Sequence, residues 1–225
     1  MIFSPVKSIY KYPMHTIALY ICDPKCSVQS GNGIMQALGN HFKFKIFGRN
    51  RLEDCFFNDV DMIAVPGGFG DADSYSSVMK YNQDRIRKFV SDGGRYLGVC
   101  MGAYWAGSNY LDILKGVDAV QYIRRPGTDT HRPHAKALAV TWQAHPERMF
   151  FYDGCALIGP GRKTVVSTYA NGDAMAMYQD RIGLIGCHPE SERFWYEAYR
   201  YTLPHWHERR HHQLLLEFAD GLMKR

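Results

Sequence analysis

Long apolar runs are missing from this sequence. No stretch of about 18 apolar residues occurs, which is the length needed to span a bilayer. The first residues include Lys7 and Lys11 but no apolar segment of the length found in a secretory signal. Internal repeats and low-complexity tracts are absent as well. The sequence therefore predicts a soluble, cytoplasmic protein with no membrane partner.

A concentrated basic surface is also missing. The formal net charge is +5, but much of this excess falls in residues 124–125 and 209–225. No basic stripe alternates with aromatic residues that would stack on bases. We therefore expect no nucleic-acid partner.

The cysteines and histidines lack the spacing of a metal site. Cys22 and Cys26 have no second ligand pair at a suitable distance along the chain, and His131 and His134 have no third ligand. Four of the six cysteines lie in or beside apolar, strand-like runs, which is typical of reduced buried thiols. The sequence predicts no metal and no cofactor.

Short apolar runs alternate with helical patterns in the first half of the chain. Strands are expected at residues 16–22, 42–47, 61–65 and 96–99, and helices from Ser27 or Ser30 to residue 38 and over residues 76–90. This alternation predicts an α/β fold, a flavodoxin-like doubly wound and mostly parallel sheet with helices on both faces. Ligands of such folds collect beyond the carboxyl ends of the strands.

The pattern changes after Gly107, where short apolar runs are separated by turn residues. These runs cover residues 117–123, 137–142, 149–152, 164–169, 174–178 and 182–186, and hairpin turns are expected at 171–173 and 179–181. They predict an antiparallel β extension, followed by helices at 192–201 and 206–223 whose histidines face solvent. We expect one domain over residues 1–225, with a lead segment at 1–14 and a C-terminal helix within 203–225.

The segment R-Y-L-G-V-C-M-G-A-Y places Cys100 between a strand and a helix-compatible run. Gly98 and Gly102 stand two residues either side of it. Small residues at these positions are typical of a nucleophile elbow, in which a strained backbone turn presents the nucleophile. The helix that follows would favour the thiolate through its dipole.

A cysteine nucleophile needs a base, and the base needs an acceptor that fixes its tautomer. His188 and Glu190 follow a late strand and supply that pair. In an extended H-x-E segment both side chains would point the same way. We predict Cys100, His188 and Glu190 as the catalytic residues.

Gly67, Gly68 and Gly70 follow the strand at 61–65. Glycine lets backbone N–H groups approach a ligand, so the amides of Gly68 and Met101 are predicted to form an oxyanion hole. Gly67 and Gly70 are predicted to contact the substrate.

The motifs V-P-G-G-F-G, G-V-C-M-G and C-H-P-E-S-E, in this order and at these separations, resemble the class I glutamine amidotransferase-like superfamily. The resemblance covers roughly residues 15–200 and implies a Cys-His-Glu triad at Cys100, His188 and Glu190. It also implies an amide or glutamine-like small-molecule substrate and a synthetase or ligase partner.

Within the superfamily, the sequence is most similar to the amino-terminal domain of biotin-protein ligases. C-x-G-x-Y at Cys100 to Tyr104, R-P-G-T at Arg125 to Thr128, a Tyr-Asx-Gly turn at 152–154 and H-P-E carry this likeness. No G-R-G-R-x-G-R-like biotinyl-adenylate loop occurs, so the chain is not expected to attach biotin.

One position departs from the glutaminase pattern, because Tyr104 stands where typical members have glutamine. Tyr104 either lines the pocket or belongs to the core. Arg125 and His131 are candidates to bind a substrate carboxylate. Two functions follow: a cysteine-dependent amide hydrolase or amidotransferase-like enzyme, or a non-catalytic domain that keeps the pocket to sense a metabolite.

Overall fold

The computed structural model describes residues 14–69 and 72–225, in which the strands form one eleven-stranded sheet. The strands are β1 (Thr16–Tyr20), β2 (Lys43–Phe47), β3 (Met62–Val65), β4 (Arg95–Val99), β5 (Asp118–Gln121), β6 (Lys136–Trp142), β7 (His145–Phe151), β8 (Cys155–Ile158), β9 (Thr164–Tyr169), β10 (Ala174–Gln179) and β11 (Ile182–Ile185). The α-helices are α1 (Val28–Leu38), α2 (Ala72–Met79), α3 (Gln83–Ser91), α4 (Met101–Tyr104), α5 (Arg193–Glu197) and α6 (Arg210–Met223). Two short 3-10 helices are η1 (Tyr122–Arg124) and η2 (Leu203–His205). The predicted lead segment lies outside the described residues, except for Met14.

Half of the sheet is parallel, as the sequence predicted. The strand order is β2-β1-β3-β4-β11, and every neighbouring pair in this part runs in the same direction. The residues of β3 and β11 are all buried, because helices cover both faces and leave no side for polar residues. The α/β fold built on a parallel sheet is therefore confirmed.

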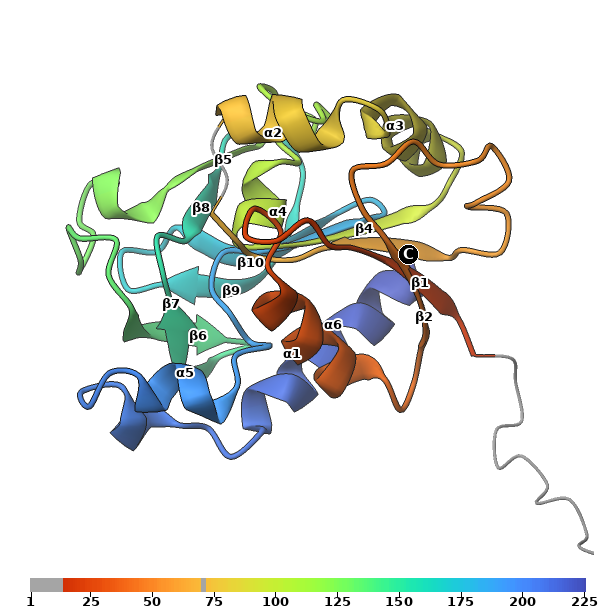
Figure 1. The fold of residues 1–225 in the computed structure, drawn as a ribbon. Coiled ribbons are helices and arrows are strands. Elements are labelled where there is room, and N and C mark those ends of the chain that lie inside the picture. Colours follow the sequence, from red (N-terminus) through yellow and green to blue (C-terminus); the bar gives the residue numbers. More distant parts are fainter. Residues whose placement is uncertain (1–13, 70–71) are drawn as a thin grey trace, which may run out of the picture.

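The helices lie on both faces of the sheet (Figure 1). α2, α3 and α4 cover one face, where Tyr75, Ile86 and Trp105 enter the core, and α1 and α6 cover the other with Ile34 and Phe218. The helix predicted over residues 76–90 is two helices, α2 and α3. The helix breaks at Asn82 because the side chain of this buried residue is bonded to another segment of the chain. Its Nδ2 donates to the carbonyl oxygens of Gly48 and Asn50 at 3.0 and 2.8 Å.

The antiparallel extension is present as β11-β10-β9-β6-β7. The expected turns at 171–173 and 179–181 join β9 to β10 and β10 to β11, with positive φ at Gly172 (88°) and Asp180 (49°). A further hairpin joins β6 and β7 through Gln143 and Ala144, which both have positive φ. The sequence analysis missed β8, which pairs with β5 and β10.

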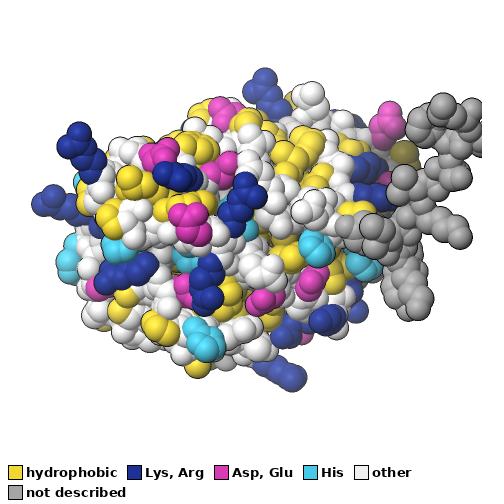
Figure 2. Space-filling view, turned by 90° about the horizontal axis from the view of Figure 1, so that it is seen from below, with side chains coloured by type: hydrophobic (Ala, Val, Ile, Leu, Met, Phe, Trp, Pro, Cys, Tyr) yellow, Lys and Arg dark blue, Asp and Glu magenta, His cyan; other side chains and the backbone are white. Residues whose placement is uncertain are grey.

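The C-terminal region corrects two predictions. The helix expected at 192–201 is the five-residue α5. The last helix begins at Arg210 because Glu208 and Arg209, directly before it, have positive φ (46° and 67°) and cannot belong to a right-handed helix. The histidines of α6 do not face solvent: His211 and His212 are buried. On the face shown in Figure 2, basic side chains are scattered among acidic ones and do not form one stripe.

Candidate active site

Cys100 lies in the sharp turn between β4 and α4, with φ 48° and ψ −105°. This conformation is strained for a residue with a Cβ. The neighbouring glycines are required by close backbone contact, since a Cβ at Gly102 would lie 2.0 Å from the Val65 carbonyl oxygen and one at Gly98 would lie 2.5 Å from that of Gly102. The turn therefore has the geometry expected of an elbow. The helix after it is a single turn of four residues, so the expected contribution of a helix dipole is small.

His188 and Glu190 meet in a buried ion pair just beyond β11. His188 Nδ1 lies 2.8 Å from Glu190 Oε1, and the two side chains are 6% and 0% exposed. The segment is a turn and not extended as predicted, because the Ser191 N–H donates to the His188 carbonyl at 3.2 Å around Pro189. The pair still forms, since the turn also brings both side chains together.

Cys100 is the other group that acts on the His188 imidazole, and both residues line the same pocket. With Nδ1 turned to the carboxylate, Nε2 is the nitrogen that remains for sulfur. Burial by itself lowers the pKa of His188, but the negative charges of Cys100 and Glu190, with the hydrogen bonds to both, outweigh it and raise that pKa to about 10. A histidine in this setting holds a proton beside the sulfur at neutral pH. Phe150 and Trp195 pack edge-on against the ring, with centroids 6.1 and 5.3 Å from the centroid of the imidazole.

The sequence patterns did not predict a fourth residue of this site, Ser30 of α1. Its hydroxyl donates to Glu190 Oε1 at 2.6 Å and accepts the N–H of Gly67 at 2.9 Å. Ser30 was considered as a helix cap, but the cap is Ser27, whose Oγ accepts the Ser30 N–H at 3.1 Å. A Cβ at Gly33, one turn on, would lie 2.2 Å from the Glu190 carbonyl oxygen. The small pair S-x-x-G on one helix face was the available signal for this close approach.

In the loop after β3, the backbone N–H groups of two residues already have acceptors. The N–H of Gly67 is taken by Ser30, and that of Phe69 donates to the Pro24 carbonyl at 3.0 Å. The amides of Gly68 and Met101 have no hydrogen bond to another described residue. These are the two amides that the sequence predicted for an oxyanion hole. Gly70 lies outside the described residues.

A pocket of about 280 Å³ opens above Cys100 and His188. Gly67, Gly68 and Ser30 form its polar wall. The opposite walls are aromatic, with Phe69, Phe150, Tyr152, Phe194, Trp195 and Tyr199. The Cys100 sulfur also lies 3.6 Å from the Tyr152 carbonyl oxygen.

Three residues predicted to contact substrate do not line this pocket. The Tyr104 hydroxyl donates to the Asp153 carbonyl at 3.1 Å, and burial raises the pKa of this phenol, so Tyr104 belongs to the core. Arg125 Nε pairs with Asp173 Oδ2 at 2.8 Å. His131 is exposed on a separate loop. None of the three is placed to bind a substrate carboxylate in this pocket.

The described residues form no group of three or more His, Cys, Asp or Glu side chains that could hold a metal ion. None of the helices in residues 14–69 and 72–225 combines the length and the apolar character needed to cross a membrane.

Comparison with known proteins supports the resemblance read from the motifs. Residues 25–118 match the family model described as biotin-protein ligase, N terminal, which confirms the likeness to that domain over less than half of the chain. None of the curated proteins compared with the chain matches it.

Solved structures share the fold over nearly the whole chain. A glutamine amidotransferase from Thermotoga maritima is 13% identical, covers 95% of this chain and 100% of its own, and gives a TM-score of 0.64. A chain of PurLQS from the same organism is 15% identical, with 93% and 100% coverage and a TM-score of 0.64. A glutamine amido transferase from Methylobacillus flagellatus is 13% identical, with 94% and 92% coverage and a TM-score of 0.56. At these identities the likeness establishes a glutamine amidotransferase-like fold.

Proposed function

We propose that this protein is a cysteine-dependent amide hydrolase or amidotransferase-like enzyme that acts on a carboxamide. One observation carries the proposal: buried hydrogen bonds join Ser30, Glu190 and His188, and His188 lines the same pocket as Cys100. Buried polar networks of this kind cost free energy unless every member has a partner. An acyl-transfer site is a chemical reason to keep one.

The reaction has two halves. The Cys100 sulfur attacks the amide carbonyl, and the oxygen becomes an oxyanion held by the N–H groups of Gly68 and Met101. His188 gives its proton to the leaving nitrogen, the C–N bond breaks, and ammonia and a thioester remain. Water then attacks the thioester while His188 accepts its proton, which releases the acid and restores the thiolate.

Glu190 holds the imidazole in the tautomer that turns Nε2 toward sulfur, and its charge stabilises the protonated form. Ser30 orients Glu190 in turn. The ammonia either leaves or passes to a synthetase or ligase partner. A partner of this kind is suggested by the family likeness, and a chain with the same fold occurs in PurLQS.

Covalent trapping tests the proposal. The protein is incubated near neutral pH with a panel of electrophilic amide and glutamine analogues, and adducts are located by intact mass and peptide mapping. We expect a single adduct on Cys100, formed at least ten times faster than on the exposed Cys55. Cys100→Ala abolishes this adduct and any amide turnover.

Cys55→Ala is the matched control and keeps the adduct, since it removes an exposed thiol on a different loop. Equal labelling of the six cysteines, or an unchanged adduct yield in Cys100→Ala, would overturn the proposal. In that case a non-catalytic pocket that senses a metabolite would be the better interpretation.

A further inference from the structure

The pocket above Cys100 has little charge to offer a ligand. Among the described residues that line it, none is Lys, Arg, Asp or Glu. The polar side-chain groups belong to Ser27, Gln29, Ser30, Cys100, Tyr152, His188, Trp195 and Tyr199. The Ser30 hydroxyl already donates to Glu190. The remaining surface is mainly aromatic.

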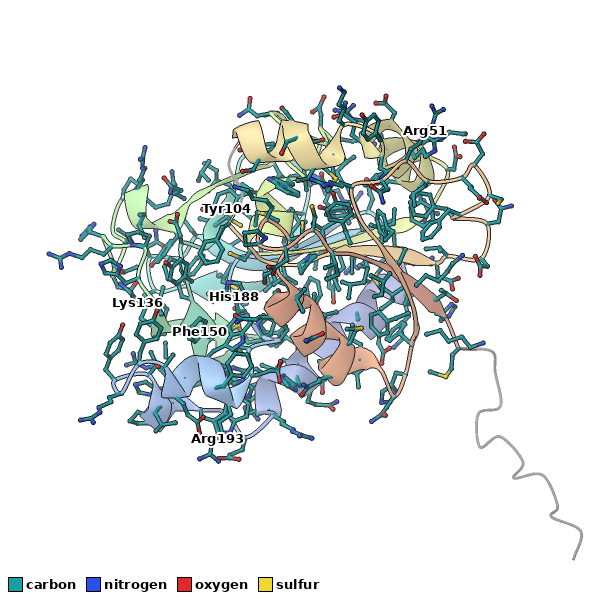
Figure 3. All side chains as sticks on the ribbon, in the orientation of Figure 1. Arg51, Tyr104, Lys136, Phe150, His188 and Arg193 are labelled. Atoms are coloured by element: carbon teal, nitrogen blue, oxygen red, sulfur yellow. The ribbon has the colours of Figure 1, made fainter. Side chains whose placement is uncertain are left out.

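Two cations in the neighbouring segments, Lys136 and Arg193, are bonded elsewhere. Lys25 and Arg200 also lie close to pocket residues along the chain but do not line the pocket. Lys136, next to the pocket residue Ala135, donates to the Arg132 carbonyl at 3.1 Å and to Thr130. Arg193, beside Phe194, pairs with Glu197 at 2.7 Å. Figure 3 shows both at the periphery of the fold, whereas His188 and Phe150 lie together inside it. Arg125, which the sequence predicted to bind a substrate carboxylate, pairs with Asp173.

Free glutamine carries an ammonium and a carboxylate group. Transfer of these charges into a pocket whose described lining residues include no Lys, Arg, Asp or Glu removes their hydration and returns no ion pair with such a residue. A chemical cap that removes the charge of each group, such as an amide on the nitrogen or an ester on the carboxylate, abolishes this desolvation cost. An apolar cap also gains contact with the aromatic wall.

Four side chains of the aromatic wall are exposed to solvent. Phe69 is 62% exposed, Phe194 45%, Tyr199 40% and Tyr152 39%. Phe69 and Tyr152 meet edge to face, with ring centroids 6.0 Å apart, although they come from the loop after β3 and from the end of β7. Single exposed aromatics are common, but several around one pocket mark a surface that a ligand covers.

We infer that the substrate is an uncharged carboxamide that carries an aromatic or other bulky apolar group, and not free glutamine. This inference rests on the proposed function, since it concerns the same site. The carboxamide lies over Cys100, and the apolar group lies against Phe69, Tyr152, Phe194 and Tyr199.

Three diazoketones with one reactive group test this inference. They are 6-diazo-5-oxo-L-norleucine, its N-acetyl methyl ester and its N-benzyloxycarbonyl methyl ester. In each, the thiol proton moves to the diazo carbon, sulfur bonds to that carbon and dinitrogen leaves. The three differ only in charge and in the apolar cap. The second-order rate of adduct formation on Cys100 is measured for each.

We expect the acetyl ester to react at least about 10-fold faster than the free amino acid, and the benzyloxycarbonyl ester about 10-fold faster again. A free amino acid that reacts as fast as the acetyl ester would overturn the inference and leave the proposed function standing. No adduct on Cys100 with any of the three would overturn the proposed function as well.

Two aromatic variants identify the surface that binds the cap. In Tyr199→Ala and Phe69→Ala the advantage of the benzyloxycarbonyl ester over the acetyl ester falls at least about 3-fold. Tyr81→Ala removes a ring that is similarly exposed, at 55%, but lies outside the pocket, and leaves the advantage unchanged. Equal advantages in all three variants and the parent protein would overturn the assignment of the cap to this wall. Thermal melts of each variant establish that the fold is retained.

Discussion

Two histidines, the buried His188 and the partly buried His207, lie in opposite electrostatic environments. His188 lies between Cys100 and Glu190, and its pKa rises to about 10. His207 lies against His211 and His212, where burial first and these two neighbours second lower its pKa to about 2. Burial opposes the charged form at both positions.

The comparison of the two pKa shifts separates the effect of burial from the effect of charged partners. A buried histidine is by default neutral, so His207 shows what packing alone does to this side chain. At His188 two acidic neighbours reverse the effect of burial. The same residue type therefore forms a packing cluster in one region (His207, His211 and His212) and pairs with Glu190 in the other, and the difference in pKa comes from the partners.

The largest expected effect concerns the packing cluster and acid stability. Burial lowers the pKa of His211 to about 4 despite Glu147, and that of His207 to about 2. Both values lie below the pKa of about 6.5 of an unfolded histidine, so below pH 6.5 the unfolded chain binds the additional protons. Stability from these groups is present above pH 6.5 and is lost as the pH falls. Each histidine contributes a slope of about 1.4 kcal/mol per pH unit.

Urea unfolding followed by tryptophan fluorescence at pH 6.5, 5.5 and 4.5 measures this slope. The double variant His207→Asn with His211→Gln has a slope lower by roughly 2 kcal/mol per pH unit over this range, because at pH 6.5 an unfolded histidine is only about half protonated. His134→Asn, at an exposed loop position, behaves as the parent protein does. Equal slopes in the double variant and the parent protein would contradict this account of the cluster.

The next effect concerns the acid and base pair. In His188→Asn no imidazole remains to take the thiol proton, and an isolated thiol is less than ~1% ionised at pH 6. Alkylation of Cys100 by iodoacetamide at pH 6 therefore falls about 100-fold, and the difference from the parent protein narrows as the pH rises toward 9. Peptide mass spectrometry gives the rate for each cysteine, and N-acetylcysteine measured in parallel serves as the reference thiol. Similar rates at pH 6 would mean that His188 does not assist the sulfur.

Much of the fold could be predicted from local sequence. The strands that carry the site are short apolar runs that end at turn residues, so β3 and β4 were found close to their true bounds. The turn at Cys100 was predictable because glycine at both Gly98 and Gly102 satisfies a steric demand set by adjacent backbone. These features depend on residues close together in the chain.

What failed depends on contacts between distant residues. Ser30 bonds Glu190 across 160 positions, and Arg125 bonds Asp173 across 48, so a single sequence gives no sign of either partner. The break at Asn82 depends on carbonyl groups more than thirty positions away. The α6 histidines were expected on a solvated face, but packing against Trp206 and Tyr196 buries the cluster.

The smallest effect concerns Ser30, which acts on the base through Glu190. Ser30→Ala removes the hydrogen bond to Oε1 and leaves the Gly67 N–H without its acceptor. A hydrogen bond to a charged group contributes roughly 1.5–3 kcal/mol, but Glu190 keeps its bond to His188, so we expect only about a 3- to 10-fold loss in the Cys100 labelling rate at pH 6. Ser30→Thr keeps the hydroxyl and recovers part of the rate. A purely structural role would lower the melting temperature of both variants without a change in the pH dependence of labelling, whereas a positioning role moves that dependence in the alanine variant and restores it in the threonine variant.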